Sequence, residues 1–334
     1  MPHDVSRDRV LVVGEALVDV VLSVVEPVET TPVETTPVET TPVETTRVET
    51  AIPGGSPLNV AVGLCRLGVP ATLHSSFGAD AHGVAIAQHL EASGVSVTPG
   101  TVRDQPTSVA LATIAADGSA SYTFSIDWDP APLDVPEGTF SAVHTGSIGA
   151  ALEPGATMVE NLLTLLQPSA IITFDPNVRP QLMGTAEQAL PRIERLVALA
   201  DVVKASDEDV AWLYPDRSVA EVLQRWCSLG PALCVITRGA DGVDALAASG
   251  PVHVPVFETV LADTIGAGDS FMSGLIWAMS TMGLLDVRRR PILRDLPSLD
   301  VRVLVTTGAR CAGITVGRPG AAPPTADEVA AAHA

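Results

Sequence analysis

The sequence predicts an α/β protein of three layers (α/β/α), in which helices cover a mostly parallel central sheet and a small antiparallel β lid lies beside it. Short apolar runs alternate with helical stretches along most of the chain, as in successive βαβ units. Hydrophobic residues make up 46% of the chain and aromatic residues only 4%, so the core consists mainly of small aliphatic side chains, as parallel sheets do. With 334 residues, the chain suits one large domain over 1–334 that carries an accessory element.

The first predicted element is a strand over residues 9–19, which read RVLVVGEALVD. Its continuous apolar character is typical of a strand that is covered on both faces. The apolar stretch continues to residue 25, but Glu15 and Asp19 interrupt it and no small-residue cleavage site follows a basic start. We therefore expect neither a signal peptide nor a membrane span here, but a first, buried strand.

Charge and cysteine content indicate which partners and which cellular location suit the protein. The chain has 39 acidic and 19 basic residues, a net charge of −20, which opposes binding to nucleic acid or to an anionic membrane surface. Its four cysteines form no C-x-x-C pair, which indicates reduced thiols and a cytoplasmic protein.

A low-complexity repeat, (P/R)-V-E-T-T, occupies residues 27–50. Proline at every fifth position prevents a helix, and such a repeat cannot bury enough apolar surface to offset its ordering entropy. We therefore expect a disordered loop within a lid formed by residues 20–53 and 100–130; a lid strand lengthened by the repeat is the alternative. In the second part of the lid, runs 108–114 and 119–126 flank Asp117-Gly118, which predicts a hairpin.

The remaining pattern predicts alternating elements in chain order. Helices are expected at 60–67, 155–167, 186–200, 206–214, 218–229, 268–282 and 299–313, and one more helix is expected to end near residue 93. Strands are expected at 71–77, 141–147, 169–175, 201–204 and 232–237, and a hairpin is expected around 242–257.

The most specific motif is the string D-T-I-G-A-G-D over residues 263–269, which leads directly into the helix at 268–282. The small residues Gly266, Ala267 and Gly268 let successive backbone N–H groups converge, and a helix N-terminus adds the positive end of its dipole. This combination makes an anion hole suited to a transferring phosphoryl group. Asp269 lies at its mouth, where it can act as the general base for an attacking hydroxyl. The alternative is a Gly-rich turn with Asp269 as an N-cap.

Two other phosphate-binding motifs do not match. A dinucleotide fingerprint needs a third glycine at position 271, which is Phe271 here, and no Gly-Lys-Ser/Thr Walker A sequence occurs.

With these motifs, the chain resembles the ribokinase-like (PfkB) family of sugar kinases, and within it the fructokinases, from about residue 9 to 325. The resemblance rests on Gly14-Glu15 with Asp19, on a G-G-x-x-x-N segment and on the string at 263–269. It implies an ATP-dependent phosphotransferase with an alcohol acceptor, acting on a primary hydroxyl of a small sugar, with fructose favoured. The residues that it implies for sugar binding are Asp19, Gly54, Gly55 and Asn59. Read alone, Asp19 could be a strand-end turn residue and Asn59 a helix cap.

On the nucleotide side, residues 203–209 resemble the family's N-x-x-E magnesium and phosphate motif, with Ser206 and Asp209 at the two key positions. Asp209 would act on Mg²⁺ through water, and the alternative is a capped, acidic helix start. The residues implied for the nucleotide are Lys204, Ser206, Thr237, Gly239 and Gly242, and those for a monovalent cation, K⁺, are Asp263, Ile265, Thr315 and Gly320.

The segment from Phe174 to Arg179 resembles fructokinases and ketodeoxygluconate kinases more than ribokinases. Arg179 could help to neutralise phosphate charge or could pair with Asp175. The lid stretch 123–129 lacks the Tyr and Arg with which ketodeoxygluconate kinases bind a carboxylate, which disfavours an acidic sugar.

The alternatives are a kinase for another sugar, for 2-keto-3-deoxygluconate or for a nucleoside, and, from another class, a catalytically silent sugar- or nucleotide-binding protein. The implied cofactors are ATP, Mg²⁺ and K⁺, and the implied partners are the sugar and a second copy of the chain, paired through the lid.

Overall fold

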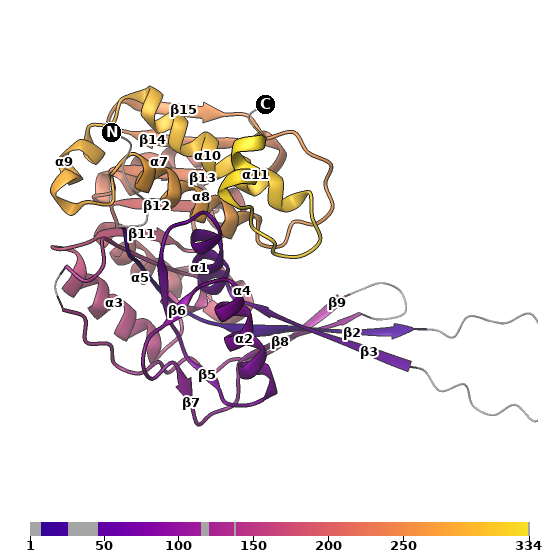
Figure 1. The fold of residues 1–334 in the computed structure, drawn as a ribbon. Helices are drawn as coiled ribbons and strands as arrows, with labels where there is room; N and C mark the ends of the chain where they lie inside the picture. The colour runs from indigo at the N-terminus through magenta and orange to yellow at the C-terminus, as the bar shows by residue number, and fades with distance from the viewer. Residues whose placement is uncertain (1–7, 26–45, 115–119, 137, 333–334) are drawn as a thin grey trace, which may run out of the picture.

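The computed structural model describes residues 8–25, 46–114, 120–136 and 138–332 (Figure 1). Among these residues the larger sheet has nine strands, in the order β15 (Gly250–Val254), β14 (Val243–Ala247), β13 (Leu233–Thr237), β12 (Val202–Ser206), β11 (Ile171–Asp175), β10 (Ala142–Gly146), β1 (Val10–Val13), β4 (Ala71–His74) and β6 (Ser96–Val97). Neighbours from β13 to β6 run parallel, and β13, β14 and β15 pair antiparallel. The predicted three-layer, mostly parallel α/β architecture is confirmed.

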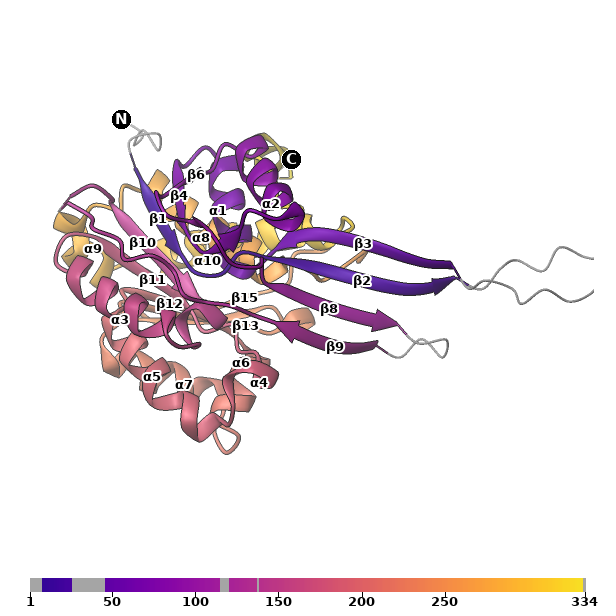
Figure 2. The same cartoon turned by 90° about the horizontal axis from the view of Figure 1, so that it is seen from below.

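Helices cover both faces of this sheet (Figure 2). On one side lie α3 (Gly155–Leu166), α5 (Ala186–Leu199) and α7 (Val219–Leu229); on the other lie α1 (Ser56–Arg66), α2 (Ala81–Ala92), α8 (Ala267–Thr281) and α10 (Ser298–Val316). The alternation of side chains along β1 explains its continuous apolar sequence, because Val10 and Val12 enter one core while Leu11 and Val13 enter the other.

A second, four-stranded sheet extends away from the body (Figure 1). Its order is β3 (Thr46–Gly54), β2 (Leu17–Val25), β8 (Val109–Ile114) and β9 (Ala120–Ser125). The predicted pairing of the 108–114 and 119–126 runs is confirmed, since β8 and β9 pair antiparallel, although the turn at Asp117-Gly118 lies outside the described residues. β2 and β3 are also antiparallel, whereas β2 and β8 run parallel, which the sequence did not predict.

The single strand predicted over 9–19 is wrong. The chain leaves the larger sheet after Val13 and begins β2 at Leu17, so the apolar run supplies strands to two sheets. The break falls at Gly14, where a Cβ atom would lie 2.3 Å from Cγ of Pro57. Only glycine therefore lets the first turn of α1 approach this bend.

The predicted loop over the repeat is also too long. Residues 27–45 lie outside the described residues, but 46–50 belong to β3.

Most other predicted elements are present with their ends shifted by a few residues. α1 begins at Ser56 rather than at 60, and α10 continues to Val316. The short helix α6 (Asp207–Leu213) was predicted. The short helices and strands that were not predicted are β5 (Phe77–Gly78), β6, β7 (Val102–Arg103), α4 (Pro180–Met183), α9 (Arg290–Arg294) and α11 (Ala326–Ala331). They are too short to show a periodic apolar pattern. Within the described part of the chain, no helix is both long enough and apolar enough to cross a bilayer.

Candidate active site

The D-T-I-G-A-G-D string forms a turn followed by the first turn of α8. Gly266 precedes the helix with a φ of 72°, a left-handed conformation that favours glycine. Within the described residues, the N–H groups of Gly266 and Gly268 have no hydrogen-bond partner, while that of Ala267 donates to the Thr264 carbonyl at 3.3 Å. The predicted anion hole therefore has open donors at two of its three positions.

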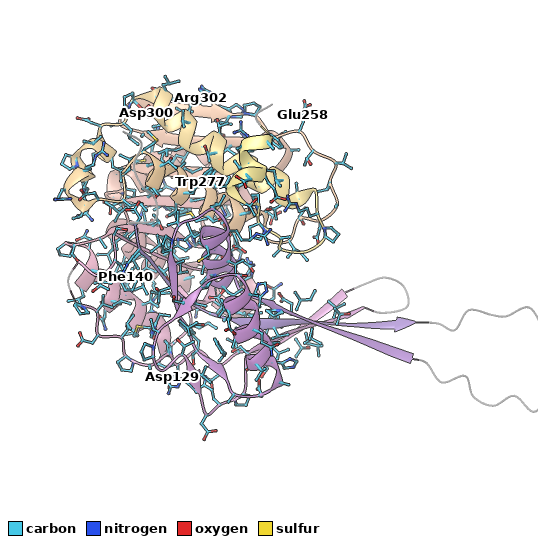
Figure 3. The ribbon with its side chains drawn as sticks, viewed as in Figure 1. Asp129, Phe140, Glu258, Trp277, Asp300 and Arg302 are labelled. Atoms are coloured by element: carbon cyan, nitrogen blue, oxygen red, sulfur yellow. The ribbon has the colours of Figure 1, made fainter. Side chains whose placement is uncertain are left out.

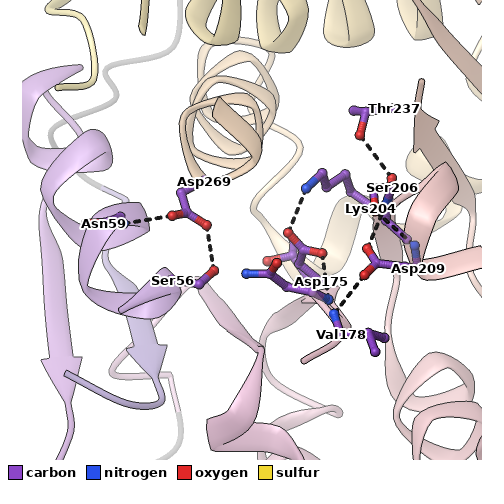
Figure 4. Close-up of polar contacts among 12 residues, drawn as sticks. Ser56, Asn59, Asp175, Val178, Lys204, Ser206, Asp209, Thr237 and Asp269 are labelled. Carbon is purple, nitrogen blue, oxygen red and sulfur yellow. Dashed lines mark hydrogen bonds and ion pairs between the residues drawn. The ribbon is translucent and has the colours of Figure 1, made fainter. Parts of the chain in front are cut away.

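Asp269 lies in this first helical turn, with only 8% of its surface exposed. Its Oδ1 accepts a hydrogen bond from Ser56 Oγ at 2.6 Å, and its Oδ2 accepts one from Asn59 Nδ2 at 2.8 Å (Figure 4). Both donors belong to the first turn of α1. The side chain is therefore not an N-cap of α8, because Gly266 holds that position.

A cavity of about 800 Å³ opens in front of Asp269. Most of the residues predicted for the site line it: Asp19, Gly55, Asn59, Arg179, Lys204, Ser206, Asp209, Thr237, Gly239, Ile265, Gly266, Ala267, Gly268 and Asp269. Gly54 lies just behind the wall, where a Cβ atom would be 2.4 Å from Oδ2 of Asp19. Gly54 thus leaves space for the Asp19 carboxylate.

Charged groups of both signs share this cavity. Reduced hydration raises the pKa of Asp19, and the nearby Asp269 adds to the effect while Arg179 opposes it. The Arg179 guanidinium is held by its own segment, because Nη1 donates to the carbonyl and side-chain oxygens of Asn177 at 3.3 and 2.7 Å. The alternative in which Arg179 pairs with Asp175 is therefore not found.

Asp175 instead pairs with Lys204, whose Nζ lies 2.9 Å from Oδ2 of the carboxylate (Figure 4). The exposed fractions are only 4% for Lys204 and 1% for Asp175. A Cβ atom on Gly268 would lie 2.8 Å from the same Nζ, so the ammonium group lies against the first turn of α8. This places a buried cation beside the predicted phosphate position.

The Asp209 carboxylate accepts hydrogen bonds from two backbone amides. Its Oδ1 accepts from the Val178 amide at 2.7 Å and its Oδ2 from the Ser206 amide at 2.8 Å, while Ser206 Oγ caps the amide of Asp209. This is a reciprocal capping box at the start of α6, the alternative that the sequence left open. The side chain still lines the cavity, and contact with Mg²⁺ through water is compatible with this position.

A second cavity, of about 620 Å³ and mainly apolar, adjoins the first. The loop 256–261 and small residues of α10 form its walls, and the predicted Gly242 lies there. Close packing of this loop depends on Gly313, where a Cβ atom would lie 2.4 Å from Phe257. Glu258 lies on the outer side of the loop (Figure 3). The two cavities share Thr237, Gly239, Thr264, Ala267 and Gly268, so the first turn of α8 lies at their junction.

The predicted cation loops lie side by side. Asp263 Oδ2 accepts from the Gly320 amide at 2.8 Å, and Oδ1 accepts from the Ile265 amide at 3.0 Å. Thr315 is fully buried, with its hydroxyl bonded to Ser270 and to the Cys311 carbonyl. Carbonyl groups, not side chains, thus remain for a cation at this place. In the described residues, no cluster of three or more His, Cys, Asp or Glu side chains is suited to a metal ion.

The sequence analysis missed several residues of the cavity. Ser56, Glu15, Ser147, Ile148, Asn177, Trp212 and Phe124 line it. Ser147 and Asn177 are the two described non-glycine residues with positive φ, at 54° and 37°. Such strained backbone gathers at functional sites, but no sequence signal marks it.

Glu15 is a buried carboxyl at this cavity, with Oε2 accepting from the Gly149 amide at 2.8 Å. Burial raises its pKa to about 7, and hydrogen bonds from Ser147 and Gly149 reduce the effect. The folded-state pKa therefore lies above the ordinary value of 4.5, so stability from this group falls as the pH rises from 4.5 to about 7.

We expect Glu15→Gln to remove this dependence of the unfolding free energy on pH. The variant should be more stable than the parent by up to about 3 kcal/mol at pH 8 and no more stable at pH 4.5, because its amide needs no ionisation. Urea unfolding across this pH range measures the difference. If the variant were more stable than the parent by the same amount at pH 4.5 and at pH 8, the raised pKa of Glu15 would be wrong.

The site places the buried Asp269 carboxylate beside the open amides of Gly266 and Gly268, on a three-layer α/β fold where a polar cavity meets an apolar one. This combination is that of a small-molecule kinase. Comparison with known proteins agrees. The family model described as "pfkB family carbohydrate kinase" matches residues 7–328, and the chain belongs to that family of sugar kinases.

Two sequence relatives and one solved structure are similar to this chain. The chain is 31% identical over 242 residues to a fructokinase of Rhizobium leguminosarum bv. trifolii, covering 71% of this chain and 74% of the relative. It is 28% identical to an aminoimidazole riboside kinase of Salmonella typhimurium, over 70% of this chain and 76% of that protein. A crystal structure of fructokinase from Vibrio cholerae in a fructose-, ADP- and calcium-bound form shares the fold, with a TM-score of 0.75 and 23% identity over 98% of this chain and 99% of that one.

Proposed function

We propose that the protein transfers the γ-phosphoryl group of ATP to a primary hydroxyl of a small neutral sugar, with fructose the favoured substrate. The observation that carries this proposal is the position of Asp269 in the first cavity, directly after Ala267 and Gly268, which line both cavities. The polar cavity suits a polyol and the apolar one suits an adenine ring. The sequence relatives named as fructokinases support the choice of sugar.

In this mechanism the substrate hydroxyl donates its proton to Asp269 as its oxygen attacks the γ-phosphorus, the bond from the γ-phosphorus to the β,γ-bridging oxygen breaks, and ADP leaves. The open amides of Gly266 and Gly268 stabilise the charge on the transferring group. Lys204, held by Asp175 against the first turn of α8, adds positive charge on the nucleotide side. Arg179 supplies a second cation at the cavity wall.

The sugar end of the cavity favours a neutral substrate. Glu15, Asp19 and Asp269 all line the cavity, and Arg179 acts with opposite charge on Glu15 and Asp19. Asp19 and Asn59 can bond vicinal hydroxyls above the glycine pair, because a carboxylate accepts hydrogen bonds and an amide both donates and accepts. A sugar carboxylate would meet this negative field.

We further propose that Mg²⁺ and a monovalent cation, K⁺, take part. Mg²⁺ would offset the negative charge of the phosphates, with Asp209 acting through water. The adjacent loops at 263–265 and 320 would offer carbonyl groups to K⁺. A relative's structure with a calcium ion bound is consistent with a divalent cation.

Location and assembly belong to the same proposal. The described cysteines are free, which supports a cytoplasmic protein. The four-stranded sheet would serve as the lid and, through its edge strands, as the contact between two copies.

An ADP-release assay across a panel of sugars tests the proposal. We expect fructose to give the highest kcat/KM, and other hexoses, 2-keto-3-deoxygluconate and nucleosides to give values lower by at least about tenfold, since a single substrate group that fits the pocket poorly costs on the order of 1–3 kcal/mol of transition-state binding. A higher value for a sugar acid or a nucleoside would replace fructose with that substrate. No turnover with any substrate, together with measurable binding of ATP or sugar by calorimetry, would indicate the catalytically silent binding protein.

A further inference from the structure

The hydroxyl of Ser56 lies in direct contact with the proposed base. Ser56 Oγ donates to Asp269 Oδ1 at 2.6 Å, and the two residues are only 7% and 8% exposed (Figure 4). The contact joins residues 213 positions apart in the chain, at the starts of α1 and α8. A short hydrogen bond to a charged acceptor is stronger than one between neutral groups.

The hydroxyl is not used by its own helix. The N-cap of α1 is Gly55, with no side-chain cap, and Ser56 is the first helical residue. Serine at a helix start ordinarily caps the backbone amides there. Here the hydroxyl points across to α8 instead.

The backbone fixes Ser56 in place. Gly55 has a φ of 106°, and a Cβ atom there would lie 2.8 Å from the Glu15 carbonyl oxygen. Pro57 packs against Gly14 so closely that no side chain fits at position 14. The first turn of α1 is therefore held against the bend between β1 and β2, and the Ser56 hydroxyl has a rigid support.

Asp269 needs such support because of its charged neighbours. Asp19 from β2 and Asp175 from β11 act on it with like charge, and Lys204 from β12 attracts it from the nucleotide side. These unequal charges would favour rotation of the carboxylate toward Lys204, which the two hydrogen bonds from α1 oppose. Each carboxylate oxygen can accept two hydrogen bonds, so the bonds from Ser56 and Asn59 leave room for a substrate hydroxyl.

We infer that Ser56 is a positioning residue that holds the Asp269 carboxylate in the orientation needed to accept the proton of the sugar hydroxyl. This inference rests on the proposed kinase function. It differs from the role proposed for Asn59, whose amide also bonds Asp269 but is expected to bind the sugar. Ser56 should therefore affect turnover more than substrate affinity.

The test compares Ser56→Ala, Ser56→Thr and Asn59→Ala with the parent, by steady-state kinetics with the best sugar of the panel. Ser56→Ala should lower kcat about 10- to 100-fold, the effect of losing a hydrogen bond to a charged group, and change the KM for the sugar less than about threefold. Ser56→Thr, which keeps a hydroxyl, should restore kcat to within about fivefold of the parent. Asn59→Ala should raise the KM for the sugar as well.

Ser75→Ala provides the matched control. Ser75 is a fully buried serine outside both cavities, and its hydroxyl has no partner among the described residues, so this variant should keep the parental kcat. All variants are assayed well below their measured Tm, so that loss of folded protein does not affect the comparison.

The outcomes separate the two proposals. If the parent turns over no sugar, the proposed function fails. If the parent is active but Ser56→Ala keeps kcat within about twofold, the positioning role is wrong while the kinase proposal stands. A rise in KM that equals the fall in kcat, or a folded Ser56→Thr variant as slow as Ser56→Ala, would also overturn the inference.

Discussion

Replacing Asp269 with asparagine should lower kcat by about three to four orders of magnitude. The amide keeps the size of the side chain and can still bond Ser56 and Asn59, but it cannot accept the proton of the attacking hydroxyl. Sugar affinity should change little, because Asp19 and Asn59 remain in the cavity. Coupled ADP-release kinetics measure the first quantity and calorimetric titration with the sugar measures the second.

Asp300→Asn is the matched control for this change. Asp300, labelled in Figure 3, is also a first-turn aspartate, but of α10, and it lines neither of the two cavities. It should leave kcat unchanged. Turnover near the parental rate in Asp269→Asn would show that another group takes the proton, whereas a parallel loss of sugar binding would make Asp269 a ligand rather than a base.

The site residues that the sequence predicted best lie close together along the chain. The seven residues from Asp263 to Asp269 contain the turn, the helix start and the carboxylate, so local chemistry is sufficient to predict them. The central sheet was predicted for a similar reason, because each buried strand is a continuous apolar run next to a helical stretch.

The parts that were missed depend on contacts between distant segments. Ser56 follows two glycines and shows no sign of its bond to a residue 213 positions away. The end of β1 is hidden because the apolar run continues into β2, and only the packing of Pro57 on Gly14 explains the break. The sequence offered Asp175 as a partner for Arg179, but the register of parallel strands β11 and β12 places Asp175 beside Lys204 instead.

Lys204→Met should cause the largest loss of stability among these variants. Methionine keeps the length of the side chain but removes the ammonium group, which leaves the Asp175 carboxylate buried without its partner. Removing one member of a buried ion pair costs about 3–5 kcal/mol of unfolding free energy. Urea unfolding at pH 8 measures this loss.

The loss should depend on pH in a defined direction. Burial raises the pKa of Asp175 to about 6 even though Lys204 opposes the effect, and without the ammonium group the pKa rises further. The folded variant therefore binds a proton that the unfolded chain releases, and its stability falls as the pH rises through this range. We expect the deficit to be small near pH 5 and full at pH 8.

The double variant Lys204→Met/Asp175→Asn separates stability from catalysis. With neither member of the pair charged, it should recover most of the unfolding free energy at pH 8, because a neutral pair of similar volume needs no compensation. The KM for ATP should be raised in both the single and the double variant, since the cation beside the first turn of α8 is missing in both. A double variant as unstable as Lys204→Met would mean that the ammonium group stabilises something other than Asp175. Full recovery of ATP affinity would restrict Lys204 to a structural role, leaving the amides of α8 and the bound cations to balance the phosphate charge.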